Sequence, residues 1–133
     1  MRAVDTNVLV RLITRDDAKQ AAAAEAFVHK GGWVSHLVLA EMTWVLSAAY
    51  DLSAHQIAKA VEMLLSHRDL AIQEVEVVQS ALSIFKHRPS LGFSDCLVLE
   101  IARRAGHLPL GTFDKDLSKI DGAERLREVH GPQ

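Results

Sequence analysis

Four acidic residues stand alone in otherwise uncharged stretches of this sequence. The first three each lie in a segment of eight or more residues without another charge, and the fourth ends a run of nine uncharged residues. A carboxylate that leaves water without a partner loses several kcal/mol of hydration free energy. Acids placed in apolar segments therefore need a compensating partner. The four residues are Asp5, Glu41, Asp95 and Asp114.

A divalent cation with oxygen ligands is the simplest partner that these carboxylates could share, because no lysine or arginine in the same segments is placed to neutralise them. Magnesium or manganese suits a site made only of oxygen atoms. Zinc does not suit it, since the seven histidines show no pair at the spacing of metal ligands. The chemistry predicted from these residues is the binding of Mg²⁺ or Mn²⁺.

The composition of the chain is that of one globular domain, which we expect to span residues 1–133. Of its 133 residues 49% are hydrophobic and 24% charged, enough for a core without cross-links. The net charge of −2 argues against nucleic-acid binding by bulk electrostatics. A carboxylate cluster loaded with cations could still meet a polyanion locally.

The sequence also indicates a cytoplasmic protein. Its single cysteine, Cys96, cannot close a disulfide within the chain and fits a reducing compartment. The longest runs without charge stay far short of the ~20 apolar residues that span a bilayer. Asp5 interrupts the apolar start, which argues against a signal peptide.

Short apolar runs typical of strands alternate with segments whose apolar residues recur at helical spacing. This alternation predicts an α/β fold, with a central and mostly parallel sheet between helices. We expect the helix over 37–50 to be enclosed by the fold. The expected strands lie at 2–5, 33–35, 69–73 and 108–112, with a possible edge strand at 126–129, and the helices run from about 8, 21, 37, 57, 75 and 97.

Three polar residues are predicted to begin helices. Asp17 with Gln20 and Ser53 with Gln56 have the spacing of capping boxes, and Ser94 can cap the helix that follows it. Glycines end two of the helices, at 31–32 and 106. The residues of the last helix expected to face inward are Leu97, Val98, Ile101, Ala102 and Ala105.

The predicted topology allows the four acids to converge. In open parallel sheets functional groups gather at the carboxyl ends of the strands. Asp5 and Asp114 each follow a predicted strand, Asp95 opens a helix, and Glu41 lies about one turn into a helix that follows a strand. All four can therefore face one crevice.

Each acid also has a purely structural interpretation. Asp5 could cap the helix after it, and Asp95 could interact with the dipole of its own helix. Asp114 and Asp116 could be turn residues on a solvated loop. Glu41 is the hardest to explain in this way, because an acid inside a helix gains nothing as a cap.

The segments around these acids resemble the PIN-domain ribonucleases, and particularly the VapC-like toxins of bacterial toxin–antitoxin pairs. The matching stretches are AVDTNVLVRLI, LAEMTWVL, FSDCLVLEIARRAG and TFDKDL, and their order and spacing agree over the whole chain. The resemblance implies a three-layer α/β/α sandwich and an endoribonuclease that depends on Mg²⁺ or Mn²⁺. It also implies an RNA substrate, a VapB-like antitoxin partner and a homodimer.

The same resemblance implies roles for individual residues. Asp5, Glu41, Asp95 and Asp114 carry over as the catalytic and metal-binding acids, and Asp116 as a further metal ligand. Asn7 and Thr112 match polar positions that line or orient the site.

Two other functions remain open at this level. A PIN-like scaffold could bind RNA or protein without cutting, and the presence of all four acids does not distinguish it from an enzyme. A receiver-like Mg²⁺-binding signalling domain has a similar length and sheet. It needs paired acids after its first strand, whereas Asp5 has no acidic neighbour, and Asp69 precedes its strand instead of following it.

Overall fold

A computed structural model describes residues 1–129, within which six α-helices, five short strands and one 3₁₀ helix alternate. The chain begins with β1 (Arg2–Ala3), α1 (Thr6–Thr14), α2 (Ala18–His29), β2 (Gly32–Val34), α3 (His36–Ala48) and α4 (Ala54–Ser66). It continues with β3 (Leu70–Ile72), α5 (Val75–His87), α6 (Phe93–Ala105), β4 (Leu110–Thr112), η1 (Leu117–Lys119) and β5 (Ala123–Arg125).

Side-chain caps fix the start of several helices. Asp17 accepts a hydrogen bond from the Gln20 backbone N–H at α2, and both halves of the predicted capping box between Ser53 and Gln56 form at α4. Ser35 caps α3 in the same way. Gly106, with a φ of 82°, ends α6 in the left-handed conformation that glycine adopts without strain.

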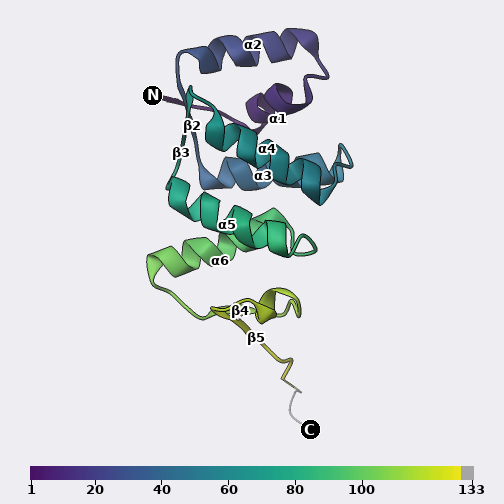
Figure 1. The fold of residues 1–133 in the computed structure, drawn as a ribbon, viewed down its shortest axis with the longest axis vertical. Helices are drawn as coiled ribbons and strands as arrows, with labels where there is room; N and C mark the ends of the chain where they lie inside the picture. The colour runs from purple at the N-terminus through teal and green to yellow at the C-terminus, as the bar shows by residue number, and fades with distance from the viewer. Residues whose placement is uncertain (130–133) are drawn as a thin grey trace.

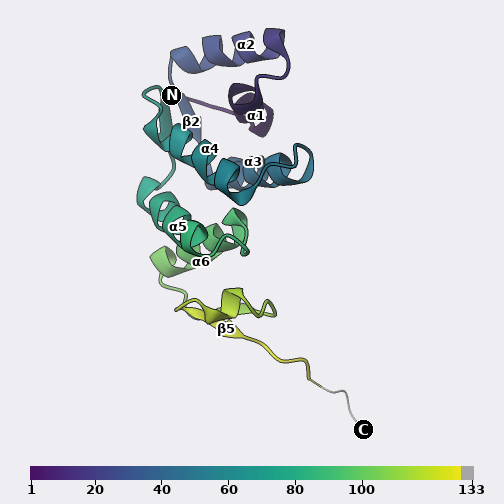
Figure 2. The same cartoon turned by 45° about the vertical axis from the view of Figure 1, so that its right-hand side comes forward.

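The strands confirm the predicted α/β sandwich class, with every described pairing parallel. They form two separate sheets, one of three strands in the order β1-β2-β3 and one made of β4 and β5. Figure 1 shows α5 and α6 lying between these two sheets, and the turned view of Figure 2 shows the same succession along the long axis of the molecule. The α/β class was predicted correctly, but the strands of the described residues form two sheets and not the one central sheet that was expected.

One hydrophobic core joins the helices to the three-stranded sheet. Leu9 of α1, Val34 of β2, Leu46 of α3, Val61 of α4 and Leu99 of α6 are all fully buried in it. Burial of side chains of this size stabilises a fold by about 1.5–3 kcal/mol each. The core fixes α1, α3 and α6 relative to one another, and these helices carry three of the four acids.

Two predictions about helices were wrong in detail. The last long helix begins at Phe93, after Gly92 at the N-cap position with a φ of 75°, so Ser94 lies inside the first turn and does not cap it. The helix α3 is not enclosed, because Leu37 and Trp44 both have 68% of their surface exposed. Its outward face carries Glu41 as well.

The expected inward face of α6 was also wrong in part. Leu97 is buried, but Val98 and Ile101 are exposed, as is Ala105. The reason is that α6 packs mainly on α5 and α3, which cover only part of its surface. The possible edge strand at 126–129 is displaced to 123–125, where it pairs with β4.

Candidate functional site

Asp5 lies two residues beyond β1, at the N-terminus of α1. Its Oδ1 accepts a hydrogen bond of 2.8 Å from the backbone N–H of Thr6. Helix-capping carboxylates more often bond to the second or third N–H of a helix. Asp5 is exposed, and Oδ2 is the oxygen that this cap leaves open to a ligand.

Thr6 connects Asp5 to Glu41. Its side chain is nearly buried, and its Oγ1 donates to Glu41 Oε2 over 3.1 Å. This bond joins the first residue of α1 to the middle of α3, 35 positions later in the chain. Glu41 is thus held in place by a neutral hydroxyl and keeps Oε1 for other contacts. Thr6 was not predicted from the sequence as a site residue, although its position directly after Asp5 is a signal that could have revealed it.

Asp95 and Asp114 form a second pair. Asp95 lies in the first turn of α6 and is partly buried. Its pKa is raised above the ordinary value, first by burial and then by repulsion from the Asp114 carboxylate. A cation bound by both carboxylates would relieve this repulsion.

Backbone N–H groups of the loop after β4 hold the Asp114 side chain in place. Oδ1 of Asp114 accepts the N–H groups of Asp116 at 2.8 Å and Leu117 at 3.0 Å, and the Asp114 N–H donates to Thr112 Oγ1 at 3.0 Å. Asp116 itself is exposed and pairs with Lys119 at 3.8 Å. Asp114 therefore does stabilise a turn, but only through one oxygen.

The four acids are brought together as two pairs rather than as one cluster. One pair is Asp5 with Glu41, and the other is Asp95 with Asp114. Among residues 1–129, no three acidic, histidine or cysteine side chains lie close enough together to hold a metal ion. Whether all four serve one site stays a prediction.

Other predicted positions lie apart from the acids. Asn7 is exposed beside a shallow hollow between α1 and α2, which Arg11 and Phe27 also line. Cys96 is fully buried next to Asp95, and burial together with the Asp95 charge raises its pKa to about 12. This agrees with its interpretation as a small apolar residue of the core.

An ion pair on α6 with a buried acid was not predicted from the sequence. Glu100 is only 8% exposed, and the guanidinium of Arg103 donates to its carboxylate over 3.1 Å. Arg103 also donates to the Asp121 carbonyl oxygen at 2.6 Å. These contacts fasten the loop before β5 to α6, and with it the segment that carries Asp114.

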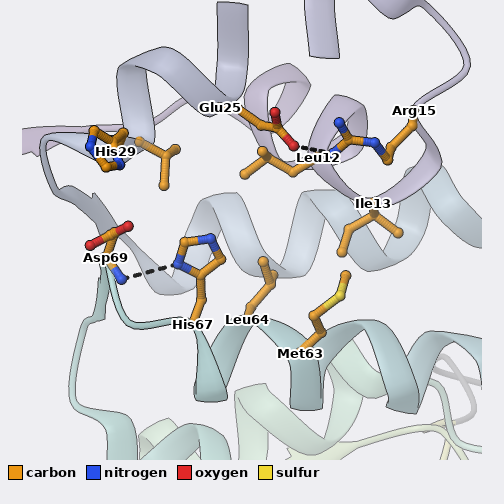
Figure 3. Close-up of a pocket in the computed structure, with 10 residues that line it drawn as sticks. Leu12, Ile13, Arg15, Glu25, His29, Met63, Leu64, His67 and Asp69 are labelled. Atoms are coloured by element: carbon orange, nitrogen blue, oxygen red, sulfur yellow. Dashed lines mark hydrogen bonds and ion pairs between the residues drawn. The ribbon is translucent and has the colours of Figure 1, made fainter. Parts of the chain in front are cut away.

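A pocket of about 390 Å³ lies elsewhere, between α1, α2 and α4. Figure 3 shows Leu12, Ile13 and Leu64 around it, together with an ion pair of 2.6 Å between Arg15 and Glu25. None of the four acids lines this pocket. It is a feature separate from the carboxylate pairs.

Parallel strands with acids just beyond their carboxyl ends define an α/β protein whose polar groups lie where such sheets usually bind ligands. A family model described as PIN domain matches residues 2–123, so the chain belongs to the PIN domain family. Proteins of this family are generally nucleases and typically use divalent metals. No curated protein and no solved structure gave a significant match. Within the described residues, no helix is both long enough and apolar enough to cross a membrane.

Proposed function

We propose that this chain, as a single PIN domain, is a cytoplasmic endoribonuclease that requires Mg²⁺ or Mn²⁺ and acts as the toxin of a VapBC-type pair. The observation that carries this proposal is the placement of Asp5 and Asp114 just beyond parallel strands of a PIN-family chain, with Asp95 close enough to Asp114 for their charges to interact. Acidic groups that perturb one another in this way are common at functional sites.

The donor atoms fit a hard divalent cation. Asp5, Glu41, Asp95 and Asp114 offer only carboxylate oxygens, which Mg²⁺ and Mn²⁺ prefer, and Asp116 adds another on the same loop as Asp114. Bound there, such a cation would lower the pKa of a water molecule and neutralise charge on a phosphodiester. The proposal assigns these five acids to holding it.

The chain itself supplies orientation and a proton acceptor. Thr6 fixes one oxygen of Glu41 and leaves the other free to accept a proton from an attacking water molecule. The backbone N–H groups after Asp114 hold that carboxylate in the same manner. Because water is the attacking group, the products should carry a 5′-phosphate and a 3′-hydroxyl.

The direct test is cleavage of labelled single-stranded RNA by the purified protein. We expect cutting with Mg²⁺ or Mn²⁺, none with EDTA, and none with Asp95→Asn, which keeps the shape of the side chain. Cutting that persists in EDTA, or products with 2′,3′-cyclic phosphates, would contradict the proposed chemistry. RNA binding without cleavage, whichever cation is added, would instead identify a catalytically silent scaffold.

A second readout does not depend on activity. Mg²⁺ should raise the melting temperature of the wild-type protein, because it binds the native carboxylates more tightly than those of the unfolded chain. The rise should be much smaller for Asp95→Asn. An equal rise in Lys59→Ala, which removes an ion pair to Glu62 on α4 and none at the five acids, serves as the control.

The antitoxin is the proposed regulator. A basic side chain of its C-terminal segment could neutralise Asp95 and Asp114 in place of metal, giving inhibition that competes with Mg²⁺ and weakens in high salt. Titrating Mg²⁺ into the complex, and replacing the basic residues of that segment by alanine, tests this. Inhibition unchanged in both experiments would exclude a partner that acts at the acids.

A further inference from the structure

Trp44 is an exposed aromatic residue close to the proposed catalytic acids. It lies three positions after Glu41 on α3, so the two side chains are neighbours on one side of this helix. The indole keeps 68% of its surface exposed, although it is one of the largest apolar groups in the chain. An indole held open in this way presents a flat face on which a planar aromatic ligand can stack.

Trp44 lines a hollow of about 360 Å³ between α3, α4 and the start of α6. Most of its lining is apolar, and it includes the buried residues Ile57 and Phe93. Ser47 and Ser94 line it as well, and a hydroxyl can either donate to or accept from the edge of a base. None of the described residues that line it carries a charge. An apolar hollow with a few polar groups is typical of a pocket for a small ligand.

The hollow lies beside both carboxylate pairs. On one side, Trp44 is one helical turn from Glu41 of the first pair. On the other side, Ser94 directly precedes Asp95 of the second pair. The helices α3 and α6 pack against each other, so the two sides belong to one surface. A nucleotide bound here would therefore be next to the acids that are proposed to act on its phosphodiester.

A second hollow, of about 580 Å³, lies between α4 and α5 and adjoins the first one. Three residues line both hollows, one on α4, one on α5 and one in the loop after α5. In the second hollow Lys59 and Lys86 face a single acid, Glu62, to which Lys86 is bonded while the Lys59 Nζ lies 4.0 Å away. Two lysines against one carboxylate leave a surplus positive charge. In a chain of net charge −2, this local surplus suits a phosphate group.

We propose that the hollow beside Trp44 binds one unpaired base of the RNA substrate, stacked on the indole, and that a neighbouring phosphate lies against the lysines of the second hollow. The occupant is single-stranded RNA, because a base must leave its own stack before it can stack on a side chain. Stacking accepts every base, and the hydroxyls of Ser47 and Ser94 can select among bases through their edges. The inference rests on the proposed function in taking RNA as the substrate, and it assigns Trp44 to binding and not to the chemical step.

The first test measures the affinity for labelled single-stranded RNA of random sequence, about 12 nucleotides long, within the range that one single-strand-binding fold covers. EDTA is present, so that no cleavage is expected. Trp44→Ala should bind about tenfold more weakly, since stacking on an aromatic side chain contributes roughly 5- to 150-fold in affinity for each base. Trp44→Phe should retain most of the affinity.

Leu37→Ala is the matched control for this test. Leu37 is as exposed as Trp44 and lies on the same helix, but it does not line the hollow, so this variant should bind RNA like the wild type. Trp44→Leu keeps much of the apolar bulk and lacks the aromatic face. It should bind as weakly as Trp44→Ala, and it replaces that variant if circular dichroism shows it to be unfolded.

The second test identifies the base that stacks on Trp44. RNAs of one sequence, each with a single abasic nucleotide at a different position, are titrated with the wild type and with Trp44→Ala. At the stacking position both proteins should bind equally, whereas at the other positions the wild type should bind more tightly. A wild-type advantage that persists at every position would refute the stacking.

The salt dependence of binding tests the second hollow. For single strands, each neutralised phosphate contributes about 0.7 to the slope of log affinity against log salt concentration. Lys86→Ala should reduce the slope by about this amount. Lys19→Ala should leave it unchanged, because Lys19 lies on α2, which both views place away from α5 (Figures 1 and 2). An equal change in both variants would contradict a phosphate at the second hollow.

The two proposals fail in different ways. A wild type that cuts RNA, together with a Trp44→Ala variant that binds RNA equally well, would overturn the base pocket and leave the nuclease proposal intact. RNA that is bound through Trp44 but never cut would overturn the nuclease proposal alone. No RNA binding by the wild type would overturn both. If Trp44→Ala instead converts a sedimenting dimer into a monomer, the hollow belongs to an interface with a second copy, and the base pocket is wrong.

Discussion

Replacing Thr6 by valine tests whether a single hydroxyl positions Glu41. The change keeps the shape of the side chain and removes only the hydrogen bond of 3.1 Å to Oε2. Hydrogen bonds to charged groups contribute about 1.5–3 kcal/mol. Because Glu41 is exposed, water can replace the lost donor, and we expect the free energy of unfolding to fall by about 1 kcal/mol or less.

The expected effect on catalysis is larger than the effect on stability. A Glu41 carboxylate without its anchor samples other rotamers, and a loss of about 1.4 kcal/mol of transition-state stabilisation corresponds to a tenfold lower rate. The assay is single-turnover cleavage of RNA at saturating Mg²⁺, with thermal melting in parallel. Thr6→Ser keeps the hydroxyl and should retain most of the activity.

Thr43→Val is the matched control. Thr43 is similarly buried, and its Oγ1 donates to the Ala40 carbonyl oxygen at 2.8 Å, within α3, and makes no bond to a carboxylate. It should lose comparable stability with unchanged activity. Full activity of Thr6→Val, or an equal loss of activity in both variants, would refute the positioning role of Thr6.

Three further predictions concern the fold. The pKa of Asp16 is lowered by hydrogen bonds from Thr14 and Tyr50 and by the charge of Arg11; its stabilising contribution is therefore present above its ordinary pKa of 3.8 and is lost as the pH falls. Asp16→Asn should accordingly lower the melting temperature at pH 7 and match the wild type in strong acid, and a constant difference across pH would contradict this sign. Gly32→Ala should destabilise the protein by about 1–3 kcal/mol in urea titrations, because its Cβ would lie 3.0 Å from Val4 Cγ1 and 3.2 Å from Leu70 Cδ2; a neutral effect would mean that the β1–β2–β3 sheet opens easily. Leu46→Ala should lose about 2–5 kcal/mol by cavity formation, whereas Met63→Ala, at a half-exposed position, should lose far less.

Local chemistry explains what could be predicted from the sequence. The caps at Asp17 and Ser53 depend on residues three positions apart, so the pattern contains all the information that they need. The same holds for Gly106, which ends α6. Family membership followed from four short motifs in the right order, and the family match over residues 2–123 confirms it.

Long-range pairing explains what could not be predicted. The bond from Thr6 to Glu41 spans 35 positions and depends on how α1 packs on α3. Alternating strands and helices indicate parallel pairing but do not say which strands are neighbours, so the division into two sheets was not foreseen. The inward face of α6 was misassigned for the same reason, since burial of Val98 and Ile101 depends on what lies opposite them.

The buried Cys96 can report on local unfolding of α6. Its thiol is fully covered, and its pKa of about 12 keeps almost all of it protonated in the native state at neutral pH. A thiol reagent can therefore label the chain only during excursions in which α6 leaves the core. The labelling rate, divided by that of a free cysteine, measures the free energy of that opening without denaturant. Since α6 carries Asp95, the same free energy, measured with and without Mg²⁺, shows how much the cation stabilises this helix.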